Sequence, residues 1–222
     1  MDWTALSVSL WLGAGTVAIL LPCGIWFGRL LAVRQFRGTL LVEALVTVPL
    51  VLPPTVLGFY LLVTFGARSP LGEAFRALVG QSLPFTFEGL LFASAIANIP
   101  FVVQPIQRGF EAIPADVRDA AACCGLTPWQ RFLRIEVPLA WPGILTAAIL
   151  TFAHTLGEFG VVLMVGGNLP GETRTLSVAI YDRMQAFDDR SAGMMAATLL
   201  AIAVATLTAT TALSRRVGLR RG

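Results

Sequence analysis

The chain has 222 residues, of which 56% are apolar and only 13% are charged. Soluble domains carry roughly 25% charged residues, and disordered chains combine low hydrophobicity with high net charge, so neither class fits. The composition instead predicts an all-α polytopic membrane protein, with residues 1–222 forming one transmembrane domain whose core is about 8–213. The net charge of +3 comes from arginines that lie between apolar runs, so no nucleic-acid partner is expected.

Five apolar runs have about the 20 residues that a helix needs to cross a bilayer. They cover residues 8–31, 40–65, 89–107, 141–165 and 194–213. The first run is predicted to span the membrane and not to be a secretion signal, because it lacks a basic segment before it and a small-residue cleavage site within it.

The arginines between these runs predict the orientation of the chain. Eleven follow the first, third and fifth runs, at Arg29, Arg34, Arg37, Arg108, Arg118, Arg131, Arg134, Arg215, Arg216, Arg220 and Arg221. The alternate segments hold five, at Arg68, Arg76, Arg174, Arg183 and Arg190. Because arginine-rich segments stay on the inner side, the N-terminus is predicted to lie outside and the C-terminus in the cytoplasm.

Two of the runs contain polar or helix-disrupting residues, namely Pro49, Pro53, Pro54, Asn98, Pro100 and Pro105. Each proline removes a backbone donor and frees a carbonyl about one turn earlier, which in hydrocarbon must be satisfied by a neighbouring helix or a water-filled cavity. Such helices suit a packed bundle around a translocation path, with Pro53, Pro54 and Asn98 as candidates to line it. Kinking for packing alone is the alternative.

Small residues indicate close helix packing at two further places. The run 194–213 is rich in alanine and threonine and is expected to be a packing helix. In the first run, Gly24 and Gly28 form a small-xxx-small pattern that hints at dimerisation.

The segment between the third and fourth runs, residues 108–139, is predicted to form two short cytoplasmic helices. Pro114 is a natural first helical residue and Gly125 a natural stop. Thr127 is suited to cap a second helix, which Pro138 is expected to end. The second helix presents one apolar face, made by Trp129, Phe132 and Leu133. An apolar edge beside exposed charges indicates a docking surface for a soluble partner, and a hairpin lying on the membrane surface is the alternative.

Within this loop, Asp119-Ala120-Ala121 is followed after three residues by Gly125 and after nine more by Ile135-Glu136-Val137-Pro138. The pattern resembles the EAA loop of ABC importer permeases, although aspartate stands where glutamate is usual and valine where leucine is usual. The resemblance implies the type I ABC importer permease fold and a cytoplasmic ATPase subunit, in two copies, bound to this loop. It assigns the coupling role to Asp119, Ala120, Ala121, Gly125, Ile135 and Pro138.

Three further stretches, residues 49–58, 152–160 and 170–181, resemble the permeases of molybdate importers and are similar to those of sulfate and tungstate importers. The resemblance implies a multi-pass protein of the bacterial inner membrane that acts as the permease of an ATP-driven molybdate importer. It further implies a homodimer around a shared path and an extracytoplasmic molybdate-binding protein. A sulfate, thiosulfate or tungstate permease is the first alternative, and a secondary anion transporter is the second.

The chain contains no GxxxxGK[ST] sequence, so no catalytic residue is expected and ATP with its magnesium is assigned to the partner ATPase. No cofactor or metal is expected to bind this chain, because Cys23, Cys123 and Cys124 lack the spacing of a zinc site or a disulfide pair.

The run 141–165 carries two ionisable residues, His154 and Glu158, which would share one face of a helix. They are expected either to neutralise each other and lock the packing, or to leave Glu158 as a gate or interface contact near the outer end. A bare carboxylate would repel molybdate, so a structural role is favoured for Glu158, and His154 is expected to be a core histidine. Both stay candidates for the path or gate.

No arginine lies in the centre of a run, which favours a gated path whose selectivity is supplied by the external binding protein. The outer segment between the fourth and fifth runs is charged and is predicted either to dock that protein or to be solvated. Its charged residues are Glu172, Arg174, Asp182, Arg183, Asp188, Asp189 and Arg190.

Overall fold

The computed structural model describes residues 1–34 and 37–219, with side chains throughout except at residue 79 and residues 210–219. Arg220 and Arg221, which contribute to the predicted orientation, lie outside the described residues. The described chain is helical and contains no strand, which confirms the all-α prediction. Its helices are α1 (Trp3–Val33), α2 (Thr39–Val51), α3 (Pro54–Phe65), α4 (Pro70–Val79), α5 (Phe87–Glu111), α6 (Ala115–Cys123), α7 (Pro128–Arg131), the π-helical turn η1 (Phe132–Glu136), α8 (Val137–Gly157), α9 (Gly160–Gly166), α10 (Leu176–Gln185) and α11 (Asp189–Leu219).

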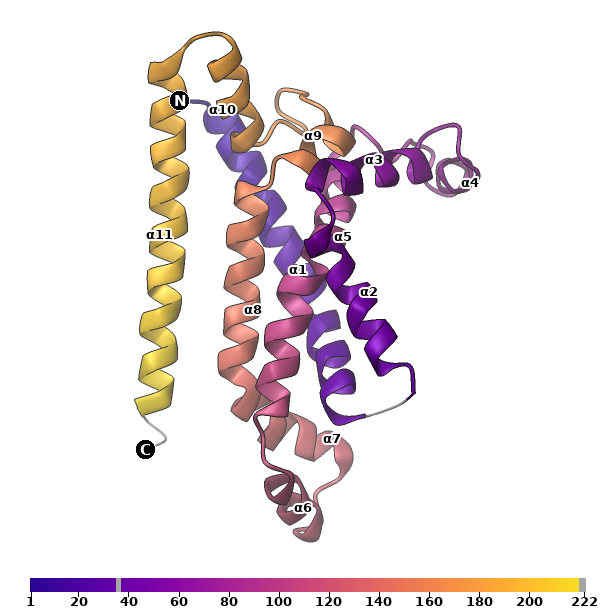
Figure 1. Cartoon of the computed structure of the whole chain (residues 1–222), viewed down its shortest axis with the longest axis vertical. Helices are drawn as coiled ribbons and strands as arrows, with labels where there is room; N and C mark the ends of the chain where they lie inside the picture. Colours follow the sequence, from indigo (N-terminus) through magenta and orange to yellow (C-terminus); the bar gives the residue numbers. More distant parts are fainter. Residues whose placement is uncertain (35–36, 220–222) are drawn as a thin grey trace.

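The long helices run side by side along the longest axis of the molecule (Figure 1). Among the described residues, α1, α5, α11 and the continuous segment Pro128–Gly157 are long and apolar enough to cross a bilayer, and α2 with α3 adds a fifth span if this bent pair counts as one. The N-terminus, α9 and α10 lie at one end of the bundle, and α6 and α7 protrude from the opposite end (Figure 1). The loop and the N-terminus therefore lie at opposite ends of the bundle, as the predicted orientation requires.

The run 40–65 is not one straight helix, as a single spanning helix would require. Leu52 and Pro53 are extended, and the axes of α2 and α3 differ in direction by 107°. A residue that precedes a proline is driven out of the helical region, and neither Pro53 nor Pro54 can donate a backbone hydrogen bond. Two consecutive prolines therefore break this run, whereas isolated Pro49 and Pro100 remain inside α2 and α5.

The run 141–165 is also divided, because α8 ends at Gly157 and Glu158 is extended with ψ 129°. The following α9 packs closely against α3. A Cβ on Gly160 would lie 2.8 Å from Pro54 Cβ and 2.9 Å from the Thr55 nitrogen, so only glycine fits at this contact. The two helix breaks consequently meet near the outer end of the bundle.

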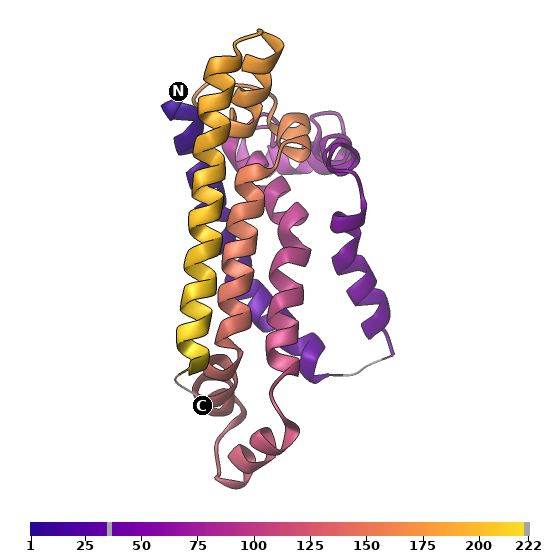
Figure 2. The same ribbon diagram turned by 60° about the vertical axis from the view of Figure 1, so that its left-hand side comes forward.

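Gly24 and Gly28 pack within the chain, so the interpretation of their spacing as a dimerisation signal is wrong. A Cβ on Gly24 would lie 2.1 Å from Val102 Cγ1, and one on Gly28 would lie 2.9 Å from Ile106 Cγ2. Small residues let helix backbones approach closely, and here they bring α1 against α5. The run predicted to be a packing helix forms α11, which packs along α8 and α10 (Figure 2).

Replacing Gly24 with alanine is expected to lower the stability of the folded chain by about 1–3 kcal/mol, because overpacking forces Val102 or the helix backbone to move. The matched control is Gly193→Ala, since nothing lies within 4 Å of a Cβ at that position. Thermal unfolding of the purified protein in detergent measures the difference. Equal unfolding temperatures for the two variants would contradict the close approach of α1 to α5.

Candidate functional site

The predicted coupling loop folds as two helices joined at Gly125. Gly125 has φ +76°, its amide donates to the Ala122 carbonyl, and the Leu126 amide donates to the Ala121 carbonyl. This is the Schellman arrangement, which requires a left-handed residue where glycine is preferred. The motif therefore ends α6 at the residue that the sequence predicts.

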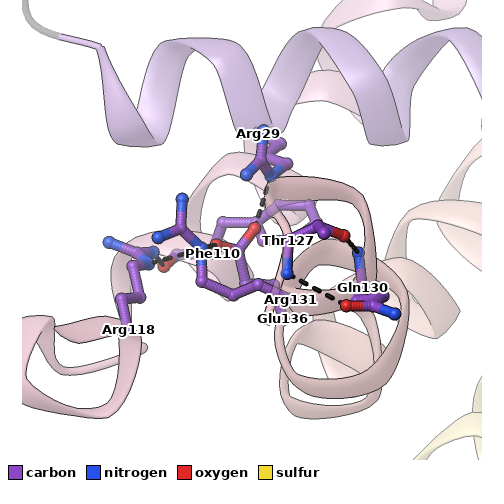
Figure 3. A network of polar contacts seen from close by, with 7 residues as sticks. All are labelled: Arg29, Phe110, Arg118, Thr127, Gln130, Arg131 and Glu136. Carbon is purple, nitrogen blue, oxygen red and sulfur yellow. Dashed lines mark hydrogen bonds and ion pairs between the residues drawn. The ribbon is translucent and has the colours of Figure 1, made fainter. Parts of the chain in front are cut away.

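The second loop helix, α7, begins at Pro128 and is capped by Thr127, as predicted. Thr127 Oγ1 accepts from the Gln130 amide at 3.3 Å, and Gln130 Oε1 accepts from the Thr127 amide at 3.0 Å (Figure 3). These two reciprocal bonds form a capping box. The capping fixes the direction in which α7 leaves the turn after Gly125.

The expectation that Pro138 ends this second helix is wrong. The chain passes from α7 through the π-helical turn η1 into α8 without a break, and the Val137 amide donates to the carbonyl of Phe132, five residues earlier. Wider π-helical turns occur as single insertions in α-helices. Pro138 is the second residue of α8 and directly follows this π-helical turn. The loop is consequently continuous with a spanning helix.

Glu136 in η1 is fully buried, with 0% of its surface exposed, and it binds three arginines (Figure 3). Its Oε2 accepts a hydrogen bond from Arg29 Nε of α1. Its Oε1 lies 3.2 Å from Arg131 Nε of α7 and 3.9 Å from Arg118 Nε of α6. One carboxylate thus connects the loop helices to the end of α1. A buried carboxylate without such partners would be strongly destabilising.

Aromatic packing reinforces this connection. The ring of Phe132 lies beneath the Arg29 guanidinium, with 5.1 Å between the guanidinium carbon and the ring centroid, and also stacks with Phe110 of α5. Arg118 donates to the Phe110 carbonyl. Phe110 is fully buried in the core where α5 crosses α8. The loop is therefore fixed to the hydrophobic core as well as to α1.

The outer surface of the loop is exposed and partly apolar. Trp129 is 66% exposed and Leu133 is 47% exposed, while Phe132 of the same predicted face turns inward. The predicted coupling residues divide in the same way: Asp119, Ala120, Gly125 and Pro138 are exposed, Ile135 is half-buried and Ala121 is buried. The loop thus presents an apolar edge that nothing in the described chain covers.

The structure pairs His154 with Asn98 and not with Glu158. His154 Nδ1 lies 3.1 Å from Asn98 Oδ1, and the Asn98 side chain also donates to the Ser94 carbonyl at 2.8 Å. The imidazole stacks on the ring of Phe101 with 4.0 Å between centroids. The shared helical face expected for His154 and Glu158 is not formed, because α8 ends between them at Gly157. This polar pair instead joins α5 to α8.

Glu158 lies in the break between α8 and α9 and is buried. Neither of its carboxylate oxygens has a hydrogen-bond partner among the described residues, whereas its backbone carbonyl accepts from Ser177 Oγ at 2.7 Å. Pro53 and Pro54 are exposed at the other break. The five candidates for the path therefore form two groups. Asn98 and His154 form one, and the residues at the two helix breaks, Pro53, Pro54 and Glu158, form the other.

The structure contains a polar recess between α2 and α5 that the sequence analysis did not predict. It has a volume of about 340 Å³ and is lined mostly by polar side chains. The Gln107 side-chain amide donates to Glu43 at 2.7 Å and to Glu111 at 2.8 Å. These residues lie at the end of the bundle that carries the loop. Within the described ranges, no group of three or more His, Cys, Asp or Glu side chains is arranged to hold a metal ion.

Several charged residues of the outer segment between α9 and α11 contact one another or their neighbours within that segment. Arg174 Nε donates to Asn168 Oδ1 at 2.6 Å, and Asn168 Nδ2 donates to Asp182 Oδ2 at 2.6 Å. Arg183 lies 3.6 Å from Asp188. These contacts hold α10 against the preceding turn.

Removing the charge of Glu136 is expected to destabilise the chain by roughly 3–5 kcal/mol, because Glu136→Gln leaves partly buried guanidinium groups unpaired. The control is Glu73→Gln on α4, where the side chain is exposed. Thermal unfolding measures stability, and limited trypsin digestion measures access to Arg118 and Arg131. Unchanged unfolding and unchanged cleavage at these arginines would contradict the assigned role of Glu136.

Comparison with known proteins agrees with these features. Residues 21–218 match the family described as the binding-protein-dependent transport system inner membrane component. The molybdenum transport system permease protein of Azotobacter vinelandii is 48% identical over 88% of this chain and 86% of its own length. The corresponding protein of Escherichia coli K12 is 37% identical over 83% and 80%, and the sulfate transport system permease protein of that strain is 32% identical over 89% and 71%.

Solved structures show the same fold. A bacterial alginate ABC transporter, in complex with a periplasmic protein that holds an alginate pentasaccharide, matches with a TM-score of 0.76 at 17% identity over 96% of this chain and 78% of that one. An inward-facing methionine ABC transporter matches with a TM-score of 0.70 at 20% identity over 97% and 94%. The fold is that of an ABC importer permease, and the chain belongs to the family of inner membrane components of binding-protein-dependent transport systems.

Proposed function

We propose that this chain is the permease subunit of an ATP-driven importer of molybdate, and that two copies form the translocation path. Support for molybdate comes from relatives named as molybdenum permeases, which at 48% and 37% identity are more similar than the sulfate permease at 32%. The observation that carries a coupled permease is the exposed apolar edge of the loop, which Glu136 fixes to α1. A channel or an ion-driven carrier has no need of such a surface.

Nucleotide chemistry is assigned to a separate cytoplasmic ATPase, in two copies, that binds the loop and holds ATP with magnesium. The chain's own residues would receive the resulting movement. Trp129 and Leu133 supply an apolar contact of the kind that forms the centre of protein interfaces. A displacement of the loop would then reach α8 through the continuous helix and α1 through Arg29 and Glu136. This is the rigid-body type of switching.

The path is proposed to pass the two helix breaks. Pro53 and Pro54 are exposed in the single chain, which suits residues that face a second copy across a shared path. Discontinuous helices are common where transporters bind their cargo. Glu158 is buried and would repel a dianion, so we assign it a structural or gating role and not a ligand role. Asn98 and His154 remain gate candidates because they join α5 to α8.

On the outer side we infer an extracytoplasmic molybdate-binding protein. The family is by description binding-protein-dependent, and the alginate transporter of the same fold was solved with a periplasmic protein attached. A permease without arginine in the middle of its spans has little means of selecting an oxyanion by itself. The binding protein would then deliver the selected anion to the path.

Reconstituted vesicles test this function. Vesicles holding the permease and its ATPase are expected to accumulate labelled molybdate only when ATP is inside and the molybdate-binding protein is outside. Sulfate is the competitor to include, because it is also a tetrahedral dianion and the cargo named for the 32% identical relative. Uptake without ATP would contradict an ABC importer, and equal displacement by sulfate would contradict the choice of molybdate.

Trp129→Ala is expected to weaken the binding of the ATPase at least about tenfold, as loss of a central interface aromatic does. Trp26→Ala on α1 is the matched control, because Trp26 is also 66% exposed but lies on a spanning helix. Co-purification and ATPase titration in detergent measure the binding. If both variants bind the ATPase as the wild type does, α7 is not the docking surface.

A further inference from the structure

The turn between α10 and α11 has an unusual residue at its tip. The Phe187 amide donates to the Met184 carbonyl at 3.1 Å, and the Asp188 amide donates to the Arg183 carbonyl at 2.9 Å. These two bonds form a Schellman arrangement, and its left-handed position is occupied by Phe187 with φ +58°. Left-handed geometry is unfavourable for a residue with a bulky side chain. Glycine would serve this turn with less strain.

Other residues with left-handed backbone geometry have a structural reason for it, and Phe187 differs from them. Gly125 occupies the same position of the same motif at the end of α6. Phe85, with φ +65°, is the other left-handed aromatic in the described chain, and its contacts explain it: its amide donates to the Val165 carbonyl at 2.8 Å and its ring lies close to Gly167. Phe187 is 92% exposed, so its ring packs against almost nothing in the described chain. Its side chain therefore has no internal role that offsets the strain.

The surroundings of Phe187 have the composition of a protein interface. Met184, whose carbonyl accepts from the Phe187 amide, is exposed, and so is Tyr181 one turn earlier on α10, although the Tyr181 ring also contacts Phe159 with 5.0 Å between centroids. Charged residues flank them, with Arg183 lying 3.6 Å from Asp188. Aromatic residues, methionine and arginine are enriched in interface centres, and charged residues in their rims. The Ser191 amide donates to Asp188 Oδ1 at 3.2 Å, so Asp188 caps the start of α11 directly after the turn.

The position of the tip indicates which partner it meets. The turn joins α10 to the outer end of α11, and it projects beyond the N-terminal end of α1 and beyond α9 in both views (Figures 1 and 2). It also lies on the α11 side of the bundle, away from α2, α3 and the exposed prolines that would face a second copy (Figure 1). The family is described as binding-protein-dependent, and the alginate transporter of the same fold was solved with a periplasmic protein, so the partner that this position favours is a soluble protein on the outer side.

We propose that Phe187, together with Met184, is the anchor through which the permease binds the molybdate-loaded binding protein. This inference rests on the proposed function and adds the residue that makes the outer contact. The strained backbone presents the ring outward in a fixed position, which reduces the entropy lost on binding.

The decisive variant is Phe187→Gly. If the Phe187 ring serves the folding of this chain, the variant should unfold at a lower temperature. If the ring serves docking, the variant should bind the partner more weakly without losing stability. Glycine relieves the left-handed strain, so the unfolding temperature should stay equal or rise. Docking should weaken, so the binding-protein concentration that gives half-maximal molybdate uptake in reconstituted vesicles should rise at least about tenfold. Phe187→Trp should keep the wild-type value approximately. Leu78→Ala on α4 is the control, because Leu78 is a similarly exposed apolar residue on another surface and should change nothing.

Photo-crosslinking identifies the partner directly. With p-benzoylphenylalanine in place of Phe187, the purified complex should crosslink to the molybdate-loaded binding protein. A crosslink to a second permease copy or to lipid alone would overturn the proposal, as would an unchanged half-saturation value for Phe187→Gly. If wild-type vesicles fail to take up molybdate with the binding protein present, the proposed function fails. If they succeed and Phe187→Gly behaves identically, only this inference fails.

Discussion

The burial of the Glu136 carboxylate is the constraint on which the loop end of this molecule depends. A carboxylate removed from water must be paired, and here its partners come from three different helices. Because Arg29 belongs to α1 while Arg118 and Arg131 belong to the loop, the charge is satisfied only when the loop lies against the bundle. The same interaction that stabilises the fold therefore defines the position of the surface offered to a partner.

A second constraint acts at the opposite end, where two helices are broken. Free backbone groups inside a membrane require partners or a water-filled space, so breaks are tolerated only within a packed or solvated interior. Gly160 against Pro54 brings the two breaks together, and Asn98 with His154 supplies a polar link between α5 and α8. The loop end and the broken end are joined by α8, which runs from η1 to Glu158. Movement of the loop is thereby connected to the region proposed to gate the path.

The features that the sequence predicts correctly are local ones. Helix caps depend on residues within one turn, so Gly125 and Thr127 mark the ends of the loop helices as expected. The membrane class follows from composition alone. The features that it misses are tertiary. Arg29 and Glu136 are 107 residues apart, and the available signal was only an acidic residue beside an apolar span with arginines nearby.

The errors have a similar origin. Regular helical spacing suggested a pair of His154 and Glu158, but the contact of α9 with α3 ends the helix between them. Pro138 is a helix breaker by ordinary rules, yet a π-helical turn just before it lets the helix continue. Gly24 has the spacing of a dimer motif, and only the contact with Val102 reveals that it serves α1 and α5.

If Glu136 fixes the loop to α1, the loop and α1 must move as one body when the ATPase acts. The native cysteines allow a direct measurement, because Cys23 on α1 and Cys123 on α6 are both exposed, and Cys124→Ser leaves these two for spin labelling. In complexes carrying one labelled copy, double electron–electron resonance should give the same distance between the labels on Cys23 and Cys123 without nucleotide and with ATP bound. A Cys23–Cys123 distance that changes on ATP binding would contradict the claim that Glu136 fixes the loop to α1.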